Sequence, residues 1–198
     1  MAQTSTTLLA SKSHIANVSG TDISFTATGT EYKITSTSTS LSGFSVRDLI
    51  TVTGTTNNNK TFTVKTVTSA NQLIVEEIVT TETSDGSTTT TLDHTGFVSD
   101  KAKGDGYYSQ PDGVHTVAYH PGATINDDST IGLIMQGSLA TTPTEDDWFD
   151  IAGTEITDAS LDGSTLAFHA NFTGNFVWVR AKVSGMTAGA VTKILYNH

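Results

Sequence analysis

Alternation of Thr with Val, Ile and Leu is the feature that most constrains the fold of this chain. In the stretch "DLITVTGTTNNNKTFTVKTVTSANQLIVEE" (48–77), apolar side chains recur at every second position. Because successive side chains of a β-strand point to opposite faces of a sheet, this period predicts strands with one buried and one solvated face. The segments "GTTNNNK" and "TSAN" favour turns. We therefore expect a meander in which Asn57 to Asn59 close a turn rather than bind a ligand.

The same alternation recurs on both sides of this stretch. It is seen earlier in "ISFTA" and "EYKIT", and later in "GVHTVAYH", "IGLIMQGSL", "LAFHANF", "NFVWVRAKV" and "AVTKILYN". In "NFVWVRAKV", one face carries Val177, Val179, Ala181 and Val183 and predicts core. The other face, with Trp178 and Arg180, predicts surface. No convincing amphipathic helix interrupts the strands, so the sequence predicts an all-β fold: a small β-barrel or meander followed by an antiparallel β-sandwich.

The amino-acid composition of the chain changes in residues 80–103. They are polar and poor in large apolar side chains, which predicts one short strand and an exposed connection. We therefore expect four parts: an extended N-terminal arm (1–14), a small β-barrel-like domain (15–98), a linker (99–106) and a β-sandwich domain (107–198).

Composition narrows the classes of function. The formal net charge is -10 and no long basic run occurs, which argues against a nucleic-acid partner and against anionic membranes. The absence of cysteine excludes disulfides and thiolate metal sites. No apolar run approaches the roughly 20 residues that span a bilayer. The first residues lack the basic and apolar regions of a signal peptide, so we expect a protein that is made and kept in a cytoplasm, or carried out on a particle or by a non-classical route.

Histidines and hydroxyl groups offer little for catalysis or metal binding. Asp93, His94 and Thr95 are consecutive, and neighbours on a strand face opposite ways, so they do not form a triad. A polar strand end or turn explains His94 better. His115 and His120 lie five apart on a predicted strand and also face opposite ways, which makes them poor ligands for a shared metal. We expect no catalytic residue, cofactor or metal.

Two acidic segments carry the oxygen ligands that Ca²⁺ favours, namely 126–128 and 145–150. Neither has the spacing of a known calcium loop, so solvated loop charge is the better interpretation. His169 lies opposite the apolar face of its strand, which predicts a residue facing solvent or an interface.

Aromatic side chains are the remaining candidates for binding a partner. They are Tyr107, Tyr108, Trp148 and Trp178. Stacking on a sugar needs several coplanar exposed rings, whereas Tyr and Trp more often pack with one polar edge satisfied. The segment "GDGYYSQPDG" places two adjacent tyrosines in a Gly-rich loop, where binding residues often lie. We expect a ligand or partner role there first.

The segment "FSVRDLITVTGTTNNNKTFTVKTVTSANQLIVEE" resembles small β-barrel modules of virion structural proteins of tailed bacteriophages. Those modules have a "GD-x-I-x-V-x-G" strand, an Asn/Gly turn, "TFTV" and "LIVEE"; here Arg47 and Asp48 stand at the Gly-Asp position. The second half is similar to β-sandwich modules of the same proteins, through "IGLIMQGSL", "DWFDIAG" and "GNFVWVRAKVSGMTAGAVTKILYNH" in that order.

The resemblance implies a non-enzymatic virion protein assembled in a host cytoplasm. The leading expectation is a capsid decoration (cement) protein that binds the major capsid protein as a homo-oligomer such as a trimer. Its arm (1–14) is then expected to pair as a strand only on the particle. The alternative is a neck, tail or fibre component that binds a host surface glycan or protein. A polysaccharide-degrading enzyme ranks last, because no two carboxylates are visibly paired.

Overall fold

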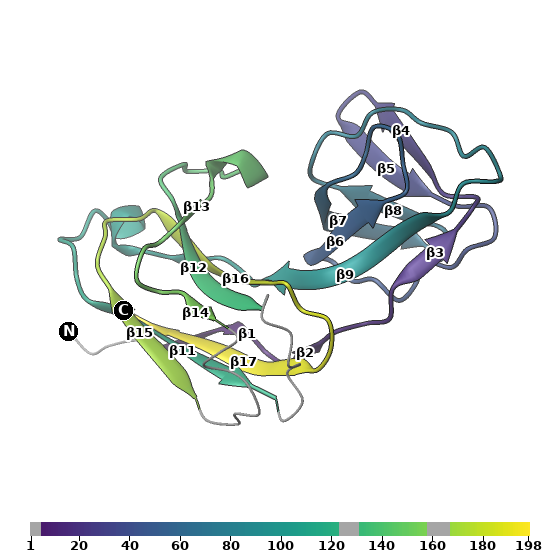
Figure 1. The fold of residues 1–198 in the computed structure, drawn as a ribbon. Coiled ribbons are helices and arrows are strands. Elements are labelled where there is room, and N and C mark those ends of the chain that lie inside the picture. Colours follow the sequence, from purple (N-terminus) through teal and green to yellow (C-terminus); the bar gives the residue numbers. More distant parts are fainter. Residues whose placement is uncertain (1–4, 123–130, 158–166) are drawn as a thin grey trace. The chain divides into compact units, whose positions relative to one another are not determined.

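The computed structural model describes residues 5–122, 131–157 and 167–198, and its regular structure is antiparallel β-sheet, as predicted (Figure 1). Within these ranges the only helical elements are two short 3-10 turns, η1 (Asp105–Tyr108) and η2 (Glu145–Asp147). Contacts divide the chain into two compact units. We call Ile15–Phe97 the first unit, and residues 1–14 together with 98–198 the second unit.

The first unit is one antiparallel sheet in the order β3-β9-β6-β7-β8-β5-β4. Its strands are β3 (Val18–Gly20), β4 (Ser24–Thr28), β5 (Glu31–Thr35), β6 (Asp48–Thr53), β7 (Thr61–Ser69), β8 (Gln72–Val75) and β9 (Thr90–Val98). The sheet is not closed into a barrel, so of the two predicted forms the meander is confirmed and the barrel is wrong. On β4, Phe25 exchanges backbone hydrogen bonds with Glu82 of a loop and not with a residue of β3.

The predicted meander forms between β6, β7 and β8. Its alternate side chains are fully buried, and they pack with apolar residues of β4, β5 and β9 into one core. That core includes Phe25, Ile34, Ile50, Val52, Phe62, Val64, Leu73, Val75 and Leu92. The period of two in the sequence therefore identified the buried face of these strands correctly.

The Asn triplet has the structural role that its turn chemistry predicts. The Asn58 side chain is fully buried; it donates to the Thr80 carbonyl and to Glu82, and it accepts a hydrogen bond from the Thr80 amide. Asn59 bonds the backbone and hydroxyl of Thr55. These bonds fasten the turn between β6 and β7 to the segment that follows β8.

One strand is longer than its sequence indicates. β9 has nine residues and pairs with β6, where the polar composition predicted a short strand. Leu92 and Phe97 are fully buried. Two anchors of this kind hold a strand in place even when polar residues and a glycine fill the positions between them, because cross-strand hydrogen bonds do not depend on side chains.

The second unit has the two layers of a β-sandwich (Figure 1). One layer has the order β1-β17-β11-β15, with β2 also on β17; the other contains β13, β12 and β16 as neighbours, with β14 on β12 and β10 on β16. The first layer has β1 (Ser5–Leu9), β2 (Lys12–Ser13), β11 (His115–Pro121), β15 (Phe168–Phe172) and β17 (Ala190–Asn197). The second has β10 (Ala102–Lys103), β12 (Gly132–Ser138), β13 (Phe149–Asp150), β14 (Ile156–Thr157) and β16 (Trp178–Ser184).

Apolar side chains on alternate positions of both layers form the core of the sandwich. They include Val117, Tyr119, Leu133, Met135, Val179, Ala181, Val183, Ile194 and Tyr196, all with at most 1% of their surface exposed. Thr154 links the layers: its carbonyl accepts the Tyr119 hydroxyl and its own hydroxyl accepts the Met135 amide. Because Val179, Ala181 and Val183 are buried, the predicted core face of β16 is confirmed.

Of the segment expected as an arm (1–14), the described residues 5–14 are not free. β1 pairs with β17 of the same chain, with Thr7 opposite Leu195, and Leu8 is 1% exposed. The prediction that this segment pairs only on a particle is therefore wrong, because its strand partner lies within the chain. The segment expected as a linker (99–106) is likewise hydrogen-bonded into the second unit, since it contains β10 and the Ser99 amide donates to Ala181.

Candidate functional site

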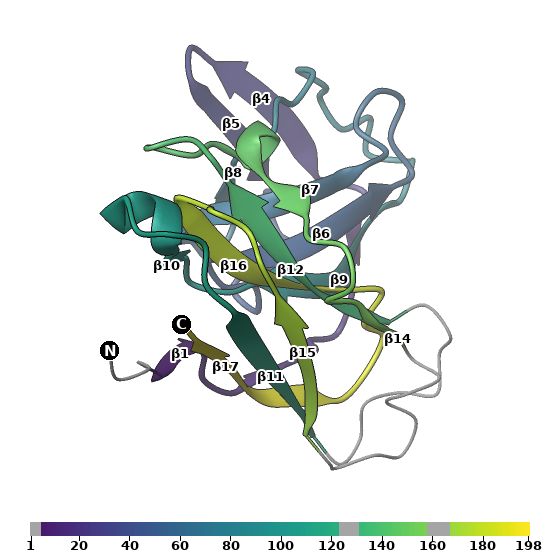
Figure 2. The same cartoon turned by 90° about the vertical axis from the view of Figure 1, so that its left-hand side faces the viewer.

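Two tyrosines, one tryptophan and two lysines lie together where η1, β10 and β16 meet. β10 pairs with β16 so that Lys103 is opposite Trp178, and η1 begins two residues later (Figure 2). The Gly104 and Gly106 amides donate to carbonyls of the segment that leads into β16. A Cβ on Gly106 would lie 2.7 Å from the Asn175 carbonyl oxygen, so only glycine permits this approach.

We call Lys101, Lys103, Tyr107, Tyr108 and Trp178 the aromatic–lysine surface. The Tyr107 ring lies 5.0 Å from Trp178 and 5.2 Å from Tyr108, measured between centroids. The Lys103 ammonium lies 4.0 Å from the Tyr107 ring centroid, and the Lys101 ammonium lies 4.5 Å from that of Trp178. Lysine ammonium groups over ring faces are a stabilising arrangement, so these side chains hold one another in place.

The tyrosines of this surface are open to solvent. Tyr107 is 43% exposed and Tyr108 is 50% exposed, whereas Trp178 is half-buried and donates its indole N–H to the Thr141 carbonyl. The ring planes meet at 62° and 74°. The three rings therefore offer exposed aromatic area and positive charge, but no flat platform of coplanar rings.

Trp148, the fourth aromatic residue expected to bind a partner, has a different neighbour. Its ring lies 4.3 Å from the guanidinium carbon of Arg180. Arg180 donates to both carboxylate oxygens of Glu145 and to Gln136, and only 6% of it is exposed. The expectation that Arg180 faces solvent is therefore wrong, because the loop that carries Glu145 and Trp148 covers it.

Acidic residues of the segment 145–150 are bonded within the chain rather than simply solvated. Besides Glu145, Asp150 accepts a hydrogen bond from Gln136, and Asp147 accepts the Thr144 amide and hydroxyl. These two bonds lower the pKa of Asp147, the backbone one most. The other acidic segment, 126–128, lies outside the described residues.

Three chemistry-bearing side chains converge near η1, the turn that carries Tyr107 and Tyr108. Ligand atoms of Asp105, Asp112 and His115 all lie within 4.8 Å of one another. His115 is fully buried, its Nδ1 is 2.9 Å from the Tyr196 hydroxyl, and its Nε2 is 3.4 Å from Asp105. Burial, and next the negative charge of Asp105, raise the pKa of Tyr196, so its hydroxyl keeps its proton.

Sequence reasoning missed this cluster because it compared His115 only with His120. The spacing D-x6-D-x2-H in "DGYYSQPDGVH" was the available signal, since it puts two carboxylates and an imidazole within eleven residues. Burial and the lysine charge of Lys193 lower the pKa of His120. His169 is exposed, as predicted.

His94 lies in the middle of β9 and is 1% exposed, so its assignment to a polar strand end or turn is wrong. Its Nε2 is 3.4 Å from Asp48, a buried residue of β6, and its Nδ1 is 3.4 Å from the Ile15 amide. The pair is formed by strand register, because Asp48 and His94 are brought together only when β6 and β9 align. Asp93 and Thr95 take no part in these two contacts.

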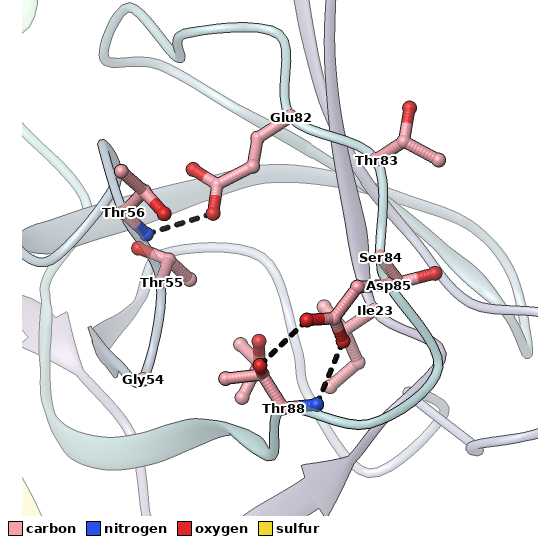
Figure 3. A pocket seen from close by; sticks show the side chains of 10 residues that line it. Ile23, Gly54, Thr55, Thr56, Glu82, Thr83, Ser84, Asp85 and Thr88 are labelled. Carbon is pink, nitrogen blue, oxygen red and sulfur yellow. Dashed lines mark hydrogen bonds between the residues drawn. The ribbon is translucent and has the colours of Figure 1, made fainter.

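A pocket of about 400 Å³ lies in the first unit between the loops after β6 and β8 (Figure 3). Both carboxylates of the pocket accept hydrogen bonds from backbone amides. Glu82 accepts those of Thr56 and Asn57, and Asp85 accepts those of Ser87 and Thr88. These bonds lower the pKa of both carboxylates, with the Thr56 and Thr88 amides as the largest causes. The acids therefore serve as loop caps.

Comparison with known proteins does not assign the chain to a family: no protein-family model and no curated protein matches it. In the described part of the chain, no helix has the length and apolar character needed to cross a membrane.

Proposed function

We propose that this chain is a non-enzymatic virion structural protein that attaches to an acidic protein surface through the aromatic–lysine surface. The sequence resemblance to β modules of tailed-phage virions supports the class. The proposed mode of attachment rests on two exposed rings, Tyr107 and Tyr108, which Lys103 borders. Tyr and Trp are enriched at the centres of protein interfaces, where their rings bury large area.

Local charge supports an acidic partner. The chain as a whole carries a net charge of -10, yet both cations of this surface, Lys101 and Lys103, stand over rings at its edge. The neighbouring Arg180 is neutralised by Glu145 and contributes no free charge. A positive surface on an acidic protein orients it toward a negatively charged partner.

Geometry favours a protein over a glycan as the partner. Ring planes at 62° and 74° do not form the coplanar array on which sugars stack. We therefore place the decoration (cement) role first, with the major capsid protein as the partner. A neck, tail or fibre role with a host surface ligand is the second candidate, supported by the exposure of Tyr107 and Tyr108 in a loop.

Association of several copies, such as a trimer, belongs to the same proposal. Sheet edges tend to be covered by symmetric contacts, and β4 and β15 end the strand orders described above. The carboxylates of the pocket in the first unit are held as loop caps, which agrees with a structural role.

Immunogold electron microscopy of purified phage particles, with antibodies against this chain, tests the location. Label spread over the head is the expected result; label confined to the tail or its tip would replace decoration by the host-binding role. Particles without label would remove the virion assignment altogether.

Attachment is tested by adding the purified chain to particles that lack it and measuring the bound fraction by sedimentation. Tyr107→Ser with Tyr108→Ser should lower the affinity at least tenfold, as loss of interface aromatics does. The control is Ile78→Ser, which removes a 66% exposed apolar side chain from the first unit and should leave binding unchanged. Equal binding by both variants would remove the aromatic–lysine surface from the proposal.

A further inference from the structure

Three potential metal ligands meet at the base of η1. Asp105 is its first residue, Asp112 lies in the loop that follows, and His115 begins β11. Their ligand atoms all lie within 4.8 Å of one another, which is close enough for one ion to contact all three. The cluster belongs to the second unit alone.

His115 provides a second and independent sign of a ligand. Its side chain is fully buried, and among the described residues its Nε2 makes no hydrogen bond. The closest carboxylate oxygen, on Asp105, is 3.4 Å away, which is longer than the 2.7–3.2 Å of an N–H···O bond. Two ligands that share a tetrahedral Zn²⁺ are about 3.3 Å apart, from bond lengths near 2.0 Å. The observed separation fits coordination better than direct bonding.

The other ring nitrogen is held as in a metal-bound imidazole. Nδ1 of His115 is 2.9 Å from the Tyr196 hydroxyl, and the Tyr196 side chain is buried. When Nδ1–H donates to that oxygen, the lone pair of Nε2 points toward the two carboxylates. Histidine ligands of metals are oriented by such a bond to their second nitrogen.

Backbone amides orient the carboxylates in turn. The Gly113 amide donates to Asp105 Oδ2 at 2.8 Å, and the Gly174 amide donates to Asp112 Oδ1 at 2.6 Å. Asp105 is buried and Asp112 is exposed, so one side of the cluster is open to solvent. An ion can therefore enter from that side and keep water as a further ligand.

We propose that Asp105, Asp112 and His115 bind one divalent transition-metal ion, with Zn²⁺ as the preferred ion. One imidazole and two carboxylates suit Zn²⁺, whereas Ca²⁺ and Mg²⁺ are bound by oxygen ligands alone. Two carboxylates also match the charge of the ion. This replaces the expectation, from sequence, that the chain binds no metal.

The bound ion stabilises the turn that carries the two tyrosines of the aromatic–lysine surface. Asp105 points inward from η1 while Tyr107 and Tyr108 are exposed on the same turn. Coordination ties that turn to β11 through His115, and it fixes the segment between them. The metal site stands independently of the proposed attachment, since its ligands and its test do not involve the partner.

Zinc binding by the untagged full-length chain tests the proposal. We expect one Zn²⁺ per chain after equilibrium dialysis against ZnCl₂, measured by mass spectrometry of the metal. Asp112→Asn keeps an acceptor for the Gly174 amide and lies on the exposed side, so it should fold normally. Because outer-shell changes alone cost 10–100-fold in affinity, loss of this ligand should weaken binding by at least about 100-fold.

Two further variants make the result specific. Asp146→Asn makes the same charge change on an exposed residue of η2 and should leave Zn²⁺ affinity unchanged. Tyr196→Phe removes the bond to Nδ1 and should weaken Zn²⁺ binding about tenfold. Equal affinity of the native chain and Asp112→Asn, or no bound Zn²⁺ in the native chain, would overturn the proposal; Asp105, His115 and Tyr196 would then form a structural polar chain only.

Discussion

Arg180 and Glu145 form a two-pronged ion pair, with nitrogen–oxygen distances of 2.8 and 2.7 Å, that fastens the loop between β12 and β13 to β16. The Trp148 ring covers the guanidinium, and the Gln136 side chain accepts the N–H on Nε. The Trp178 indole N–H, which donates to the Thr141 carbonyl, is a second bond from β16 to this loop. Both tryptophans of the chain belong to the second unit, so their fluorescence reports the unfolding of that unit.

Glu145→Gln should destabilise the second unit by about 2 kcal/mol, because it leaves the Arg180 charge buried without its partner. The loss is smaller than for a fully buried pair, since the Glu145 side chain is 22% exposed. Urea unfolding followed by tryptophan fluorescence measures it. Asp146→Asn removes an exposed neighbouring charge and should change the free energy of unfolding by less than about 0.5 kcal/mol. Equal effects of the two variants would contradict the role of the pair.

Leu8→Ala should destabilise the second unit by about 3 kcal/mol, the cost of removing a buried leucine side chain. Leu8 is 1% exposed on β1, whereas Leu139 is 64% exposed, so Leu139→Ala is the matched control and should have little effect. Deletion of residues 1–14 should abolish the unfolding transition of the second unit. A truncated chain with the native transition would restore the interpretation of a free arm.

Asn58→Ala should destabilise the first unit by about 2 kcal/mol, because it leaves the Thr80 amide and carbonyl without their buried partner. Differential scanning calorimetry measures this, since the first unit contains no tryptophan. Asn57→Ala, in the same turn but exposed, should cost much less. The same loss in both variants would mean that the turn sequence, and not the buried amide, stabilises the unit.

Asp22 makes the first unit sensitive to acid. Its pKa lies far below its ordinary value because the Thr39 hydroxyl, and then the Ser38 and Thr39 amides, donate hydrogen bonds to the carboxylate. A pKa lowered on folding adds stability above the unfolded-state value of about 4, and this stability is lost as the pH falls toward the folded-state pKa. Asp22→Asn should therefore lower the Tm at pH 7, and the difference from the native chain should shrink between pH 4 and pH 2.

The control for this pH dependence is Glu31→Gln. Glu31 makes a surface ion pair with Lys33 and is 54% exposed, so its removal should change the Tm little at any pH. Circular dichroism melts at pH 7, 4, 3 and 2 give both comparisons. A difference between native and Asp22→Asn chains that stays constant with pH would contradict the prediction.

Local pattern predicted the strands well where apolar residues alternate. β6, β7, β8, β11, β12, β16 and β17 lie where the period of two placed them. Of the predicted core face of β16, Val179, Ala181 and Val183 are buried, whereas Val177, just before the strand, is half-buried. Alternation failed for Arg180, because it tells which side of a sheet a residue faces but not whether a loop covers that side. It also failed for β9, where polar residues lie between buried Leu92 and Phe97.

For the candidate sites too, some features were predictable from the sequence and others depended on the tertiary structure. Tyr107 and Tyr108 were found from their Gly-rich loop, and their exposure agrees with that prediction. Their contact with Trp178 was not predictable, because it depends on β10 pairing with β16. The cluster of Asp105, Asp112 and His115 had a local signal in its spacing, but the loop conformation that turns both carboxylates toward the imidazole had none.

By itself, the sequence determined the turns and the strands with regular alternation, together with the apolar face that these strands bury, because these depend on the period of two and on residues a few positions apart. Tertiary structure alone decided which strands pair: β1 with β17, and β6 with β9, which brings Asp48 to His94. Partner choice depends on hydrogen bonds and packing between residues far apart in the chain. Backbone groups are the same in every strand, so the choice leaves no local mark in the sequence.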